Sequence, residues 1–351
     1  MPTITLKLEL YKPTKLKQDM YERMTQINTK FANWLLLHPD VNKATSKVFK
    51  EFSDEKFPSA IINQTIRDVK SQKKHQQSRA FRKMWCSFNN QNLKIEKNGD
   101  FYTVSFPTLE KRIGVPVVAR SYQQQWLDRI IGGMAKQGTA KLYKKKRKWF
   151  IALPITFDVE ASQGEKVMGI DLGLRYLAVA SIGTKSLFFK GNQCAYIRRR
   201  YAAKRRKLGK TKKLNAIRKF KDKEARWMKD HNHKISRQII NFAVSNGVGL
   251  IRMEDLTDIR NRAKSKKEAG RNLHSWAFYQ LKEMIRYKAE MAGIRVEIVN
   301  PEYTSQTCRC GHREKANRSG IRFKCKQCGY TIYADLNGAI NIAKAISGLV
   351  A

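Results

Sequence analysis

The sequence predicts an α/β protein in which a small N-terminal β-barrel, interrupted by helices, precedes a second α/β domain with a cysteine-rich insertion. Three observations support this fold class. Apolar residues alternate with polar ones in several short segments, and in other segments they recur every three to four residues. Four of the six cysteines cluster within 21 residues. A chain of 351 residues is long enough for two or three domains, each with its own core.

The N-terminal part begins with a strand, because apolar and polar residues alternate over 4–10. Apolar residues at helical spacing follow between about 15 and 95, and Ser59 is expected to cap a second helix there. Strand patterns return at 100–109 and 138–157, where the run KKKRK is expected at a hairpin tip. A strand, a helical insertion and later strands together predict the interrupted barrel.

A polar segment of small residues at 158–166 is expected to link the two parts. Residues 167–182 then read as a strand, a glycine-containing turn and a second strand. Apolar strands are also predicted at 250–254 and 294–299, with a helix between them. The segment 331–349 reads as strand, turn and helix. This alternation of strands and helices predicts the second α/β domain.

The composition is strongly basic, with 71 Lys and Arg against 29 Asp and Glu and a net charge of +42. Such a charge destabilises a compact chain unless a polyanion neutralises it, so we expect a nucleic-acid partner. We expect no membrane partner, because no stretch approaches the roughly 18 apolar residues that a spanning helix needs. The N-terminus also lacks the layout of a signal peptide. We therefore expect a cytoplasmic, nucleic-acid-associated protein whose cysteines are reduced.

Basic residues are densest at 190–237, where 19 Lys and Arg face 3 Asp and Glu on predicted long helices. The exposed face of an ordinary soluble helix mixes both signs, so this segment favours phosphate binding. Contacts to the nucleic-acid backbone are predicted for five arginines: Arg198, Arg199, Arg200, Arg205 and Arg206.

Three acidic residues lie at or just beyond the ends of apolar strands: Asp171 in GIDLG, Glu254 in LIRMED and Asp335 in IYADLNGA. Carboxylates in such positions are costly unless a cation compensates them. Mg²⁺ or Mn²⁺ suits an oxygen-only site, and two such ions about 4 Å apart can activate water and stabilise the leaving oxygen of a phosphodiester.

Other interpretations of the acidic residues remain open. An Arg or Lys could supply the compensating charge, and a strand-terminal Asp before Gly is often only a turn residue. GIDLG also occurs as a phosphate-binding turn in actin-like ATPases. That class needs further glycine-rich loops, and GVG at 247–249 is the one similar stretch in this sequence.

The clustered cysteines are spaced as Cys308-x-Cys310 and Cys325-x-x-Cys328, with 14 residues between the pairs. This spacing predicts one structural Zn²⁺ ion held by four thiolates. The first pair is one residue tighter than the second, which leaves three outcomes open. All four thiolates could bind, His312 could replace Cys310, or the metal could have been lost.

Four segments, taken in order, resemble the three RuvC motifs and the inserted zinc ribbon of the TnpB family, the transposon-encoded relatives of type V CRISPR nucleases. These segments are GIDLGLRYLAVAS, IRMEDL, TSQTC…CxxCG and YADLNGAINIA. The resemblance is specific over 167–345 and rests on layout over 1–160. It implies a wedge barrel at 1–12 and 96–160, a helical recognition domain at 13–95, a RuvC (ribonuclease H-like) nuclease domain at 161–302 and 331–351, and a zinc-ribbon insertion at 303–330.

The resemblance implies an RNA-guided DNA endonuclease, a hydrolase of a prokaryotic transposon. Asp171, Glu254 and Asp335 match the family's catalytic triad and would bind two Mg²⁺ or Mn²⁺ ions, with Asp171 as the hypothesised bridging ligand. The implied partners are a guide RNA derived from the transposon end and a DNA target, double-stranded and single-stranded. Guide pairing next to a short target-adjacent motif would select that target. The protein is expected to be a monomer on its RNA.

Three alternative functions remain: a nuclease-inactive or regulatory RNA-guided DNA-binding protein, a miniature type V CRISPR effector, and a structure-specific resolvase of RuvC type. The presence of all three acidic residues favours an enzyme over the inactive protein. A plain resolvase would need neither the helical insertion nor the zinc ribbon.

Overall fold

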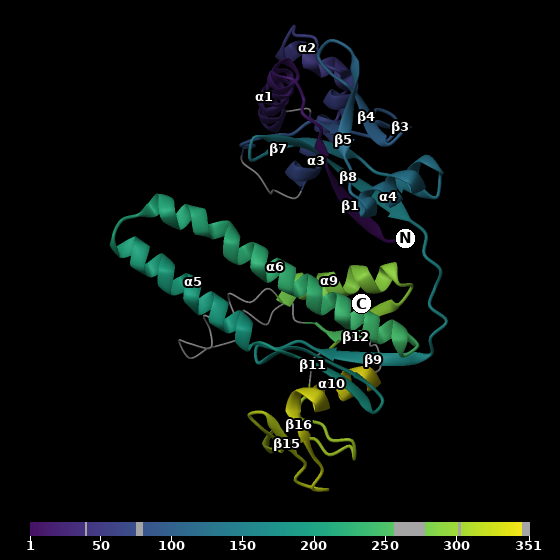
Figure 1. The fold of residues 1–351 in the computed structure, drawn as a ribbon, viewed down its shortest axis with the longest axis vertical. Coiled ribbons are helices and arrows are strands. Elements are labelled where there is room, and N and C mark those ends of the chain that lie inside the picture. Colours follow the sequence, from purple (N-terminus) through teal and green to yellow (C-terminus); the bar gives the residue numbers. More distant parts are fainter. Residues whose placement is uncertain (39–40, 75–79, 256–277, 301–302, 346–351) are drawn as a thin grey trace. The chain divides into compact units, whose positions relative to one another are not determined.

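The computed structural model describes residues 1–351 except 39–40, 75–79, 256–277, 301–302 and 346–351, which are drawn as a grey trace in Figure 1. The chain forms two compact units, Met1–Asp158 and Val159–Ala351. Each unit combines its own sheet with helices, as the predicted α/β class requires. None of the described helices is long and apolar enough to cross a membrane.

The first unit is built on an eight-stranded sheet in the order β2-β7-β8-β1-β5-β4-β3, with β6 paired to β8. The N-terminal strand is central, because it pairs antiparallel with β8 and with β5. The strands are β1 (Thr3–Leu10), β2 (Ser87–Phe88), β3 (Lys94–Asn98), β4 (Phe101–Pro107), β5 (Arg112–Val118), β6 (Ala135–Gln137), β7 (Ala140–Lys145) and β8 (Lys148–Phe157). The predicted basic hairpin tip is confirmed as the turn between β7 and β8.

The expected barrel is not closed. The strand order ends at β2 on one edge and at β3 on the other, and no pairing among the described residues joins them. Strand β2 is only two residues long, and β3 exposes four of its five residues. Short strands and polar strands are typical edges of a sheet. The polar strand β3 can end in water, whereas both residues of β2 are buried.

The helical insertion of the first unit is confirmed. It contains α1 (Lys15–Leu37), η1 (Ser46–Val48), α2 (Phe49–Phe52) and α3 (Ser59–Lys74), and α4 (Ser121–Ile131) follows later in the chain. The side chain of Thr14 caps α1 by accepting a hydrogen bond from the Lys17 amide. Between α1 and α3, the buried Asn28 accepts a 2.6 Å hydrogen bond from Thr65 and donates to the Met84 carbonyl. These bonds satisfy a polar side chain in an otherwise apolar helical core.

The second unit contains a five-stranded sheet in the order β11-β10-β9-β12-β13. Its strands are β9 (Lys166–Asp171), β10 (Tyr176–Ile182), β11 (Lys185–Lys190), β12 (Val248–Glu254) and β13 (Arg295–Val299). Strand β12 runs parallel to both β9 and β13, whereas β10 runs antiparallel to β9 and β11. Met168 and Ile170 of β9 belong to a buried core that also includes apolar residues of α6 (Leu214–Ser245) and α9 (Phe278–Met291).

Helix α10 (Ala334–Lys344) contacts β9, β10 and β12. Its backbone comes so close to β9 that a Cβ atom on Gly169 would lie 2.0 Å from the Ala339 carbonyl oxygen and 2.5 Å from the Ala343 nitrogen. Only glycine can occupy this position without displacing the helix. The close contact therefore fixes the depth at which α10 lies on the sheet.

Two further elements complete the second unit. Helices α5 (Asn192–Lys210) and α6 lie side by side as an antiparallel hairpin (Figure 1). The other is a three-stranded sheet of β14 (Arg318–Ser319), β15 (Arg322–Lys324) and β16 (Thr331–Tyr333), preceded by η2 (Lys315–Asn317). The first cysteine pair precedes this sheet, the second lies between β15 and β16, and β16 leads directly into α10. We call residues 303–333 the ribbon, since its third strand lies beyond position 330.

We predict that Gly169→Ala destabilises the second unit. The added methyl group overlaps the α10 backbone, and overpacking of this kind typically costs about 1–3 kcal/mol in the free energy of unfolding. Calorimetry should show a lower unfolding temperature. Gly209→Ala is the matched control, because that position lies in α5 with its nearest neighbouring atom 4.0 Å away. It should leave the unfolding temperature unchanged or raise it, and equal effects of the two substitutions would contradict the prediction.

Candidate active site at the ends of β9 and β12

Two of the three candidate carboxylates end adjacent parallel strands. The register of β9 and β12 pairs Ile170 with Met253, and the next residues are Asp171 and Glu254. Neighbouring residues in register project from the same face of a sheet, so both carboxylates lie on one face. Gly169 lies on this face as well, and the face is therefore the one that α10 covers.

The third carboxylate, Asp335, lies in the first turn of α10, two residues after β16 ends at Tyr333. A helix N-terminus favours a negative side chain. Farther along the same helix, a Cβ atom on Gly338 would lie 3.1 Å from Oδ2 of Asp171, so the Asp171 carboxylate packs against the α10 backbone. The sheet and α10 thus bring three residues together that are far apart in the sequence.

The charges of Glu254 and Asp335 affect the pKa of Asp171. Burial, together with the negative charges of Glu254 and Asp335, raises the pKa of Asp171 to about 8, against the opposing effect of Arg318. Burial also raises the pKa of Glu254, opposed by a hydrogen bond from Thr304 and by Arg318. Asp171 is thus a buried carboxylate with two acidic neighbours, and a divalent cation would supply the compensating positive charge.

The donor set fits Mg²⁺ or Mn²⁺, which prefer oxygen ligands. Within the described ranges, the four cysteines form the one group of three or more potential ligands whose atoms all lie within 4.8 Å of one another. The carboxylates are therefore farther apart than the thiols are.

The ribbon contributes residues to this site that the sequence did not identify. Nη2 of Arg318 donates a 3.0 Å hydrogen bond to Oδ1 of Asp335. The Thr304 hydroxyl donates to Oε1 of Glu254. The ribbon thus places a cation and a hydrogen-bond donor directly on two of the three carboxylates, in addition to holding its cysteines.

Two asparagines of α10 attach the ribbon to the helix. Asn337 donates to the Thr307 carbonyl at 2.9 Å, and Asn341 donates to the Thr304 and Thr307 carbonyls at 2.7 and 2.8 Å. Asn337 and Asn341 are four residues apart and therefore share one helix face. This spacing is the signal in the sequence that could have revealed a polar contact surface on α10.

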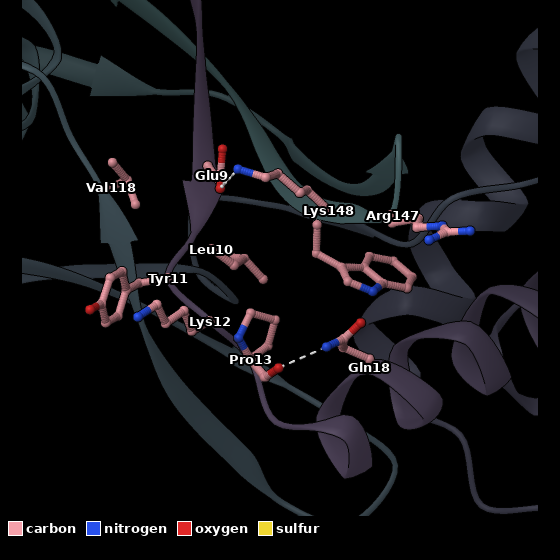
Figure 2. A pocket seen from close by; sticks show the side chains of 10 residues that line it. Glu9, Leu10, Tyr11, Lys12, Pro13, Gln18, Val118, Arg147 and Lys148 are labelled. Atoms are coloured by element: carbon pink, nitrogen blue, oxygen red, sulfur yellow. Dashed lines mark hydrogen bonds and ion pairs between the residues drawn. The ribbon is translucent and has the colours of Figure 1, made fainter.

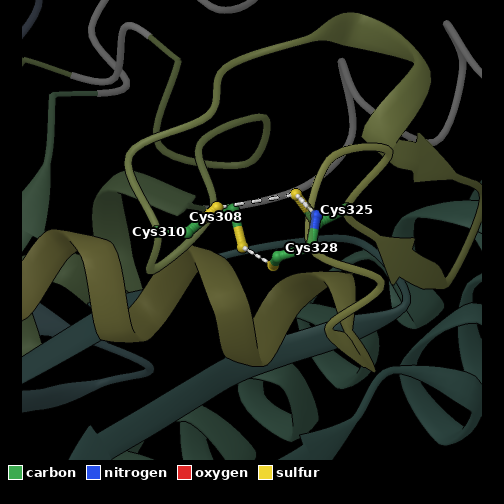
Figure 3. A group of neighbouring side chains, drawn as sticks. All are labelled: Cys308, Cys310, Cys325 and Cys328. Atoms are coloured by element: carbon green, nitrogen blue, oxygen red, sulfur yellow. Dashed lines mark hydrogen bonds between the residues drawn. The ribbon is translucent and has the colours of Figure 1, made fainter.

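The four cysteines come together, as Figure 3 shows. Cys308 and Cys328 have their sulfur atoms 3.6 Å apart, and Cys310 and Cys325 have theirs 3.7 Å apart. His312 lies elsewhere, with Nε2 3.2 Å from a carboxylate oxygen of Glu314. The arrangement favours a four-thiolate set over one in which His312 replaces Cys310.

The short spacing of the first pair is accommodated by its turn. The amide of Cys308 donates to the His312 carbonyl at 2.8 Å, and Gly311 adopts a φ of 89°, which favours glycine. In the second pair, burial tends to raise the pKa of Cys325, but the amides of Cys328 and Gln327 lower it to about 6. Such a thiol is readily available as a thiolate ligand.

The five predicted phosphate-binding arginines all lie on α5 but differ in their surroundings. Arg205 forms a 2.5 Å ion pair with Glu224 of α6, and burial lowers the pKa of Arg198. Arg199, Arg200 and Arg206 are exposed. The first two side chains thus belong to the contact between the helices, whereas the other three face solvent.

The first unit contains a hollow of about 410 Å³ (Figure 2). Glu9 lines it and is already paired with Lys148 at 2.6 Å, and the Gln18 amide donates to the Pro13 carbonyl. Trp149 also lines the hollow, and its indole nitrogen has no hydrogen-bond partner among the described atoms. The hollow is lined by a single carboxylate, that of Glu9, which already has a partner, so the hollow differs from the three-carboxylate site.

Two family models match the chain: a probable transposase over residues 135–260, and the TNB domain of Cas12f1-like proteins over residues 278–342. A TnpB-like protein of Methanocaldococcus jannaschii, MJ0751, is 30% identical over 253 residues, which is 67% of this chain and 87% of that protein. The chain belongs to the TnpB family. The second model covers the ribbon and most of α10, and the first covers β9 and β12.

This TnpB-family chain is also similar to CRISPR-associated nucleases. A Cas12f1 endodeoxyribonuclease of Sulfoacidibacillus thermotolerans is 32% identical over 67% of the chain. The chain spans 60% of that relative and 42% of a Cas12f1 from Syntrophomonas palmitatica. A Cas12f1–sgRNA–target DNA complex solved by cryo-EM shares the fold, with a TM-score of 0.69 at 18% identity over 93% of this chain and 82% of that one.

We predict that Asn341→Ala loosens the ribbon. The substitution removes two hydrogen bonds to half-buried carbonyls, each of which typically contributes about 0.5–1.5 kcal/mol. Hydrogen–deuterium exchange should become faster in residues 303–333 while β9 and β12 stay protected. Asn215→Ala, an exposed substitution near the start of α6, is the control. The anchoring role is wrong if exchange in the ribbon is the same in both variants.

Proposed function

We propose that this protein is an RNA-guided DNA endonuclease whose RuvC-like centre consists of Asp171, Glu254 and Asp335. The observation that supports this most strongly is the convergence of the three acids, in a TnpB-family chain, at the ends of two parallel strands and the start of α10. The relatives support the substrate class, since Cas12f1 is named an endodeoxyribonuclease and its solved complex contains a guide RNA and target DNA.

In the proposed mechanism, the carboxylates would hold the metal ions to which the scissile phosphate binds. Mg²⁺ or Mn²⁺ ions bound by Asp171, Glu254 and Asp335 would activate water and stabilise the leaving oxygen. Asp171 would be the ligand shared by two ions, because it ends β9 beside Glu254 of β12 and its carboxylate packs against α10, the helix that carries Asp335. Thr304 fixes the orientation of Glu254, and Arg318 holds Asp335 and offers a positive charge to the phosphate.

The remaining parts would hold the nucleic acids. We propose that the first unit combines the wedge and recognition functions, with the open sheet at 1–12 and 96–160 and the helices at 13–95. The exposed arginines of α5, Arg199, Arg200 and Arg206, would contact phosphates of the guide RNA or of the DNA target. Arg205 would act by holding α5 against Glu224 of α6.

The function is tested by sequencing the RNA that copurifies with the protein and challenging that complex with a plasmid library and Mg²⁺. We predict one discrete RNA and guide-dependent cutting next to a short motif. Asp171→Ala should lower the cleavage rate by at least about a hundredfold while target binding persists, because only transition-state stabilisation is lost.

Glu160→Ala is the matched control for the loss of one carboxylate, because Glu160 is exposed and lies outside the three-carboxylate site. It should cut like the wild type. Cleavage retained by Asp171→Ala would refute the assignment of the site, and cutting that ignores the guide would refute the assigned function.

We also propose that the ribbon binds one structural Zn²⁺ through Cys308, Cys310, Cys325 and Cys328. Purified protein should contain one zinc per chain by metal analysis. Cys310→Ser should lose it, because this variant removes one of four converging thiols, whereas His312→Ala should keep it because His312 pairs with Glu314. The opposite pattern would indicate that His312 is the fourth ligand.

A further inference from the structure

Three aromatic side chains lie together where β10 and the edge strand β11 meet the end of β16. The rings of Phe188 and Tyr333 have their centroids 6.2 Å apart at 71°, and those of Tyr176 and Phe188 are 5.4 Å apart at 66°. Tyr333 is 55% exposed, and the other two are half-buried. Phe188 is not part of the buried core of the second unit, although its neighbours Leu187 and Phe189 pack against that core.

The strand register places these rings in line with the active site. Phe188 pairs with Val179, and Val179 pairs with Asp171, so the three residues form one row across β11, β10 and β9. Residues in one row share a face, and adjacent strands lie about 4.8 Å apart, which places Phe188 roughly 10 Å from Asp171 at the backbone. Tyr333, against Phe188, precedes Asp335 by two residues.

Tyr333 lies at a position where its side chain does not stabilise α10. It is the N-cap residue of α10, and its side chain makes no capping hydrogen bond. Ser, Thr, Asp and Asn are favoured at this position because their side chains accept such a bond. A large, exposed aromatic side chain there gives up helix stabilisation, which is the kind of local conflict found at functional positions.

Positive side chains border the rings. Arg322 is the cross-strand partner of Tyr333 on β15, and Lys190 is the partner of Tyr176 on β11. Both are exposed, and neither forms an ion pair among the described residues. An exposed aromatic ring with cations nearby, such as that of Tyr333, is typical of surfaces that bind single-stranded nucleic acid, since a base stacks on the ring while the cations contact phosphates.

We propose that Tyr333, supported edge-on by Phe188, is a base-stacking subsite for the DNA strand being cut. Bases follow one another at about 3.4 Å along a strand of duplex, and farther apart when unstacked, so 10 Å corresponds to at most about three nucleotides from the phosphate at Asp171. Stacking tolerates any base, as a guided nuclease requires, but it requires an unpaired base. The subsite therefore selects single-stranded DNA. This inference rests on the proposed nuclease function.

The test combines Tyr333→Ala with target DNA that carries one abasic nucleotide, moved position by position along the strand being cut. We expect Tyr333→Ala to raise KM roughly 5- to 150-fold, the range for one stacked base, with a smaller change in kcat. Tyr333→Phe, which keeps the aromatic ring, should have the wild-type KM. At one position within about three nucleotides of the cut, the abasic site should raise the KM of the wild type but leave the KM of Tyr333→Ala unchanged.

Tyr279→Ala is the control for loss of an exposed tyrosine of the same unit, because Tyr279 lies on α9 with 73% of its surface exposed. It should leave KM unchanged. The subsite is refuted if the effects of Tyr333→Ala and the abasic nucleotide multiply at every position, or if Tyr333→Ala leaves KM unchanged.

A binding measurement separates this inference from the nuclease function. With Asp171→Ala protein, 2-aminopurine placed in single-stranded DNA should be quenched on binding, and the added Tyr333→Ala substitution should remove the quenching. Quenching without guided cutting by the wild type would refute the proposed function and keep the subsite. Guided cutting with quenching that does not depend on Tyr333 would refute the subsite alone.

Discussion

The close approach of α10 to β9 is the constraint on which the rest of the second unit depends. Because Gly169 has no side chain, the backbone of α10 lies directly on the sheet. The carboxylate of Asp171 therefore reaches the helix at Gly338, and Asp335 in the first turn comes close enough to raise the pKa of Asp171. A helix held farther from the sheet by an ordinary side chain would separate the acids.

The same closeness creates an electrostatic problem that the ribbon partly relieves. Three carboxylates in a partly buried site repel one another, and Arg318 is the ribbon's compensating charge. The ribbon can supply it because Asn337 and Asn341 hold its start against α10. The packing of α10 on β9 thus brings the acids together, α10 holds the ribbon, and the ribbon places the positive charge of Arg318 on Asp335.

Sequence patterns predicted the features that depend on local periodicity. The acids at the ends of β9 and β12 follow from apolar runs that end in a carboxylate, and the cysteine group follows from spacing alone. Closure of a barrel depends on whether the two edge strands pair with each other, and the alternation of apolar and polar residues within a strand does not specify this pairing. Arg318, in the two-residue strand β14, and Thr304, in a turn, reach their carboxylates across 17 and 50 residues. Both segments are too short to show a periodicity, so no local pattern reveals these contacts. The pairing of Arg205 likewise depends on how α5 lies against α6.

Strand β16 ends at Tyr333, and α10 begins at the next residue, so no loop separates the ribbon from the helix that carries Asp335. Loop residues often act as hinges, and this junction has none. We therefore expect a tilt of the ribbon to change the orientation of the first turn of α10 as well. The segment that holds the thiols and the helix that carries Asp335 are therefore directly coupled along the chain, so we expect a disturbance of the cysteine group to reach the carboxylates.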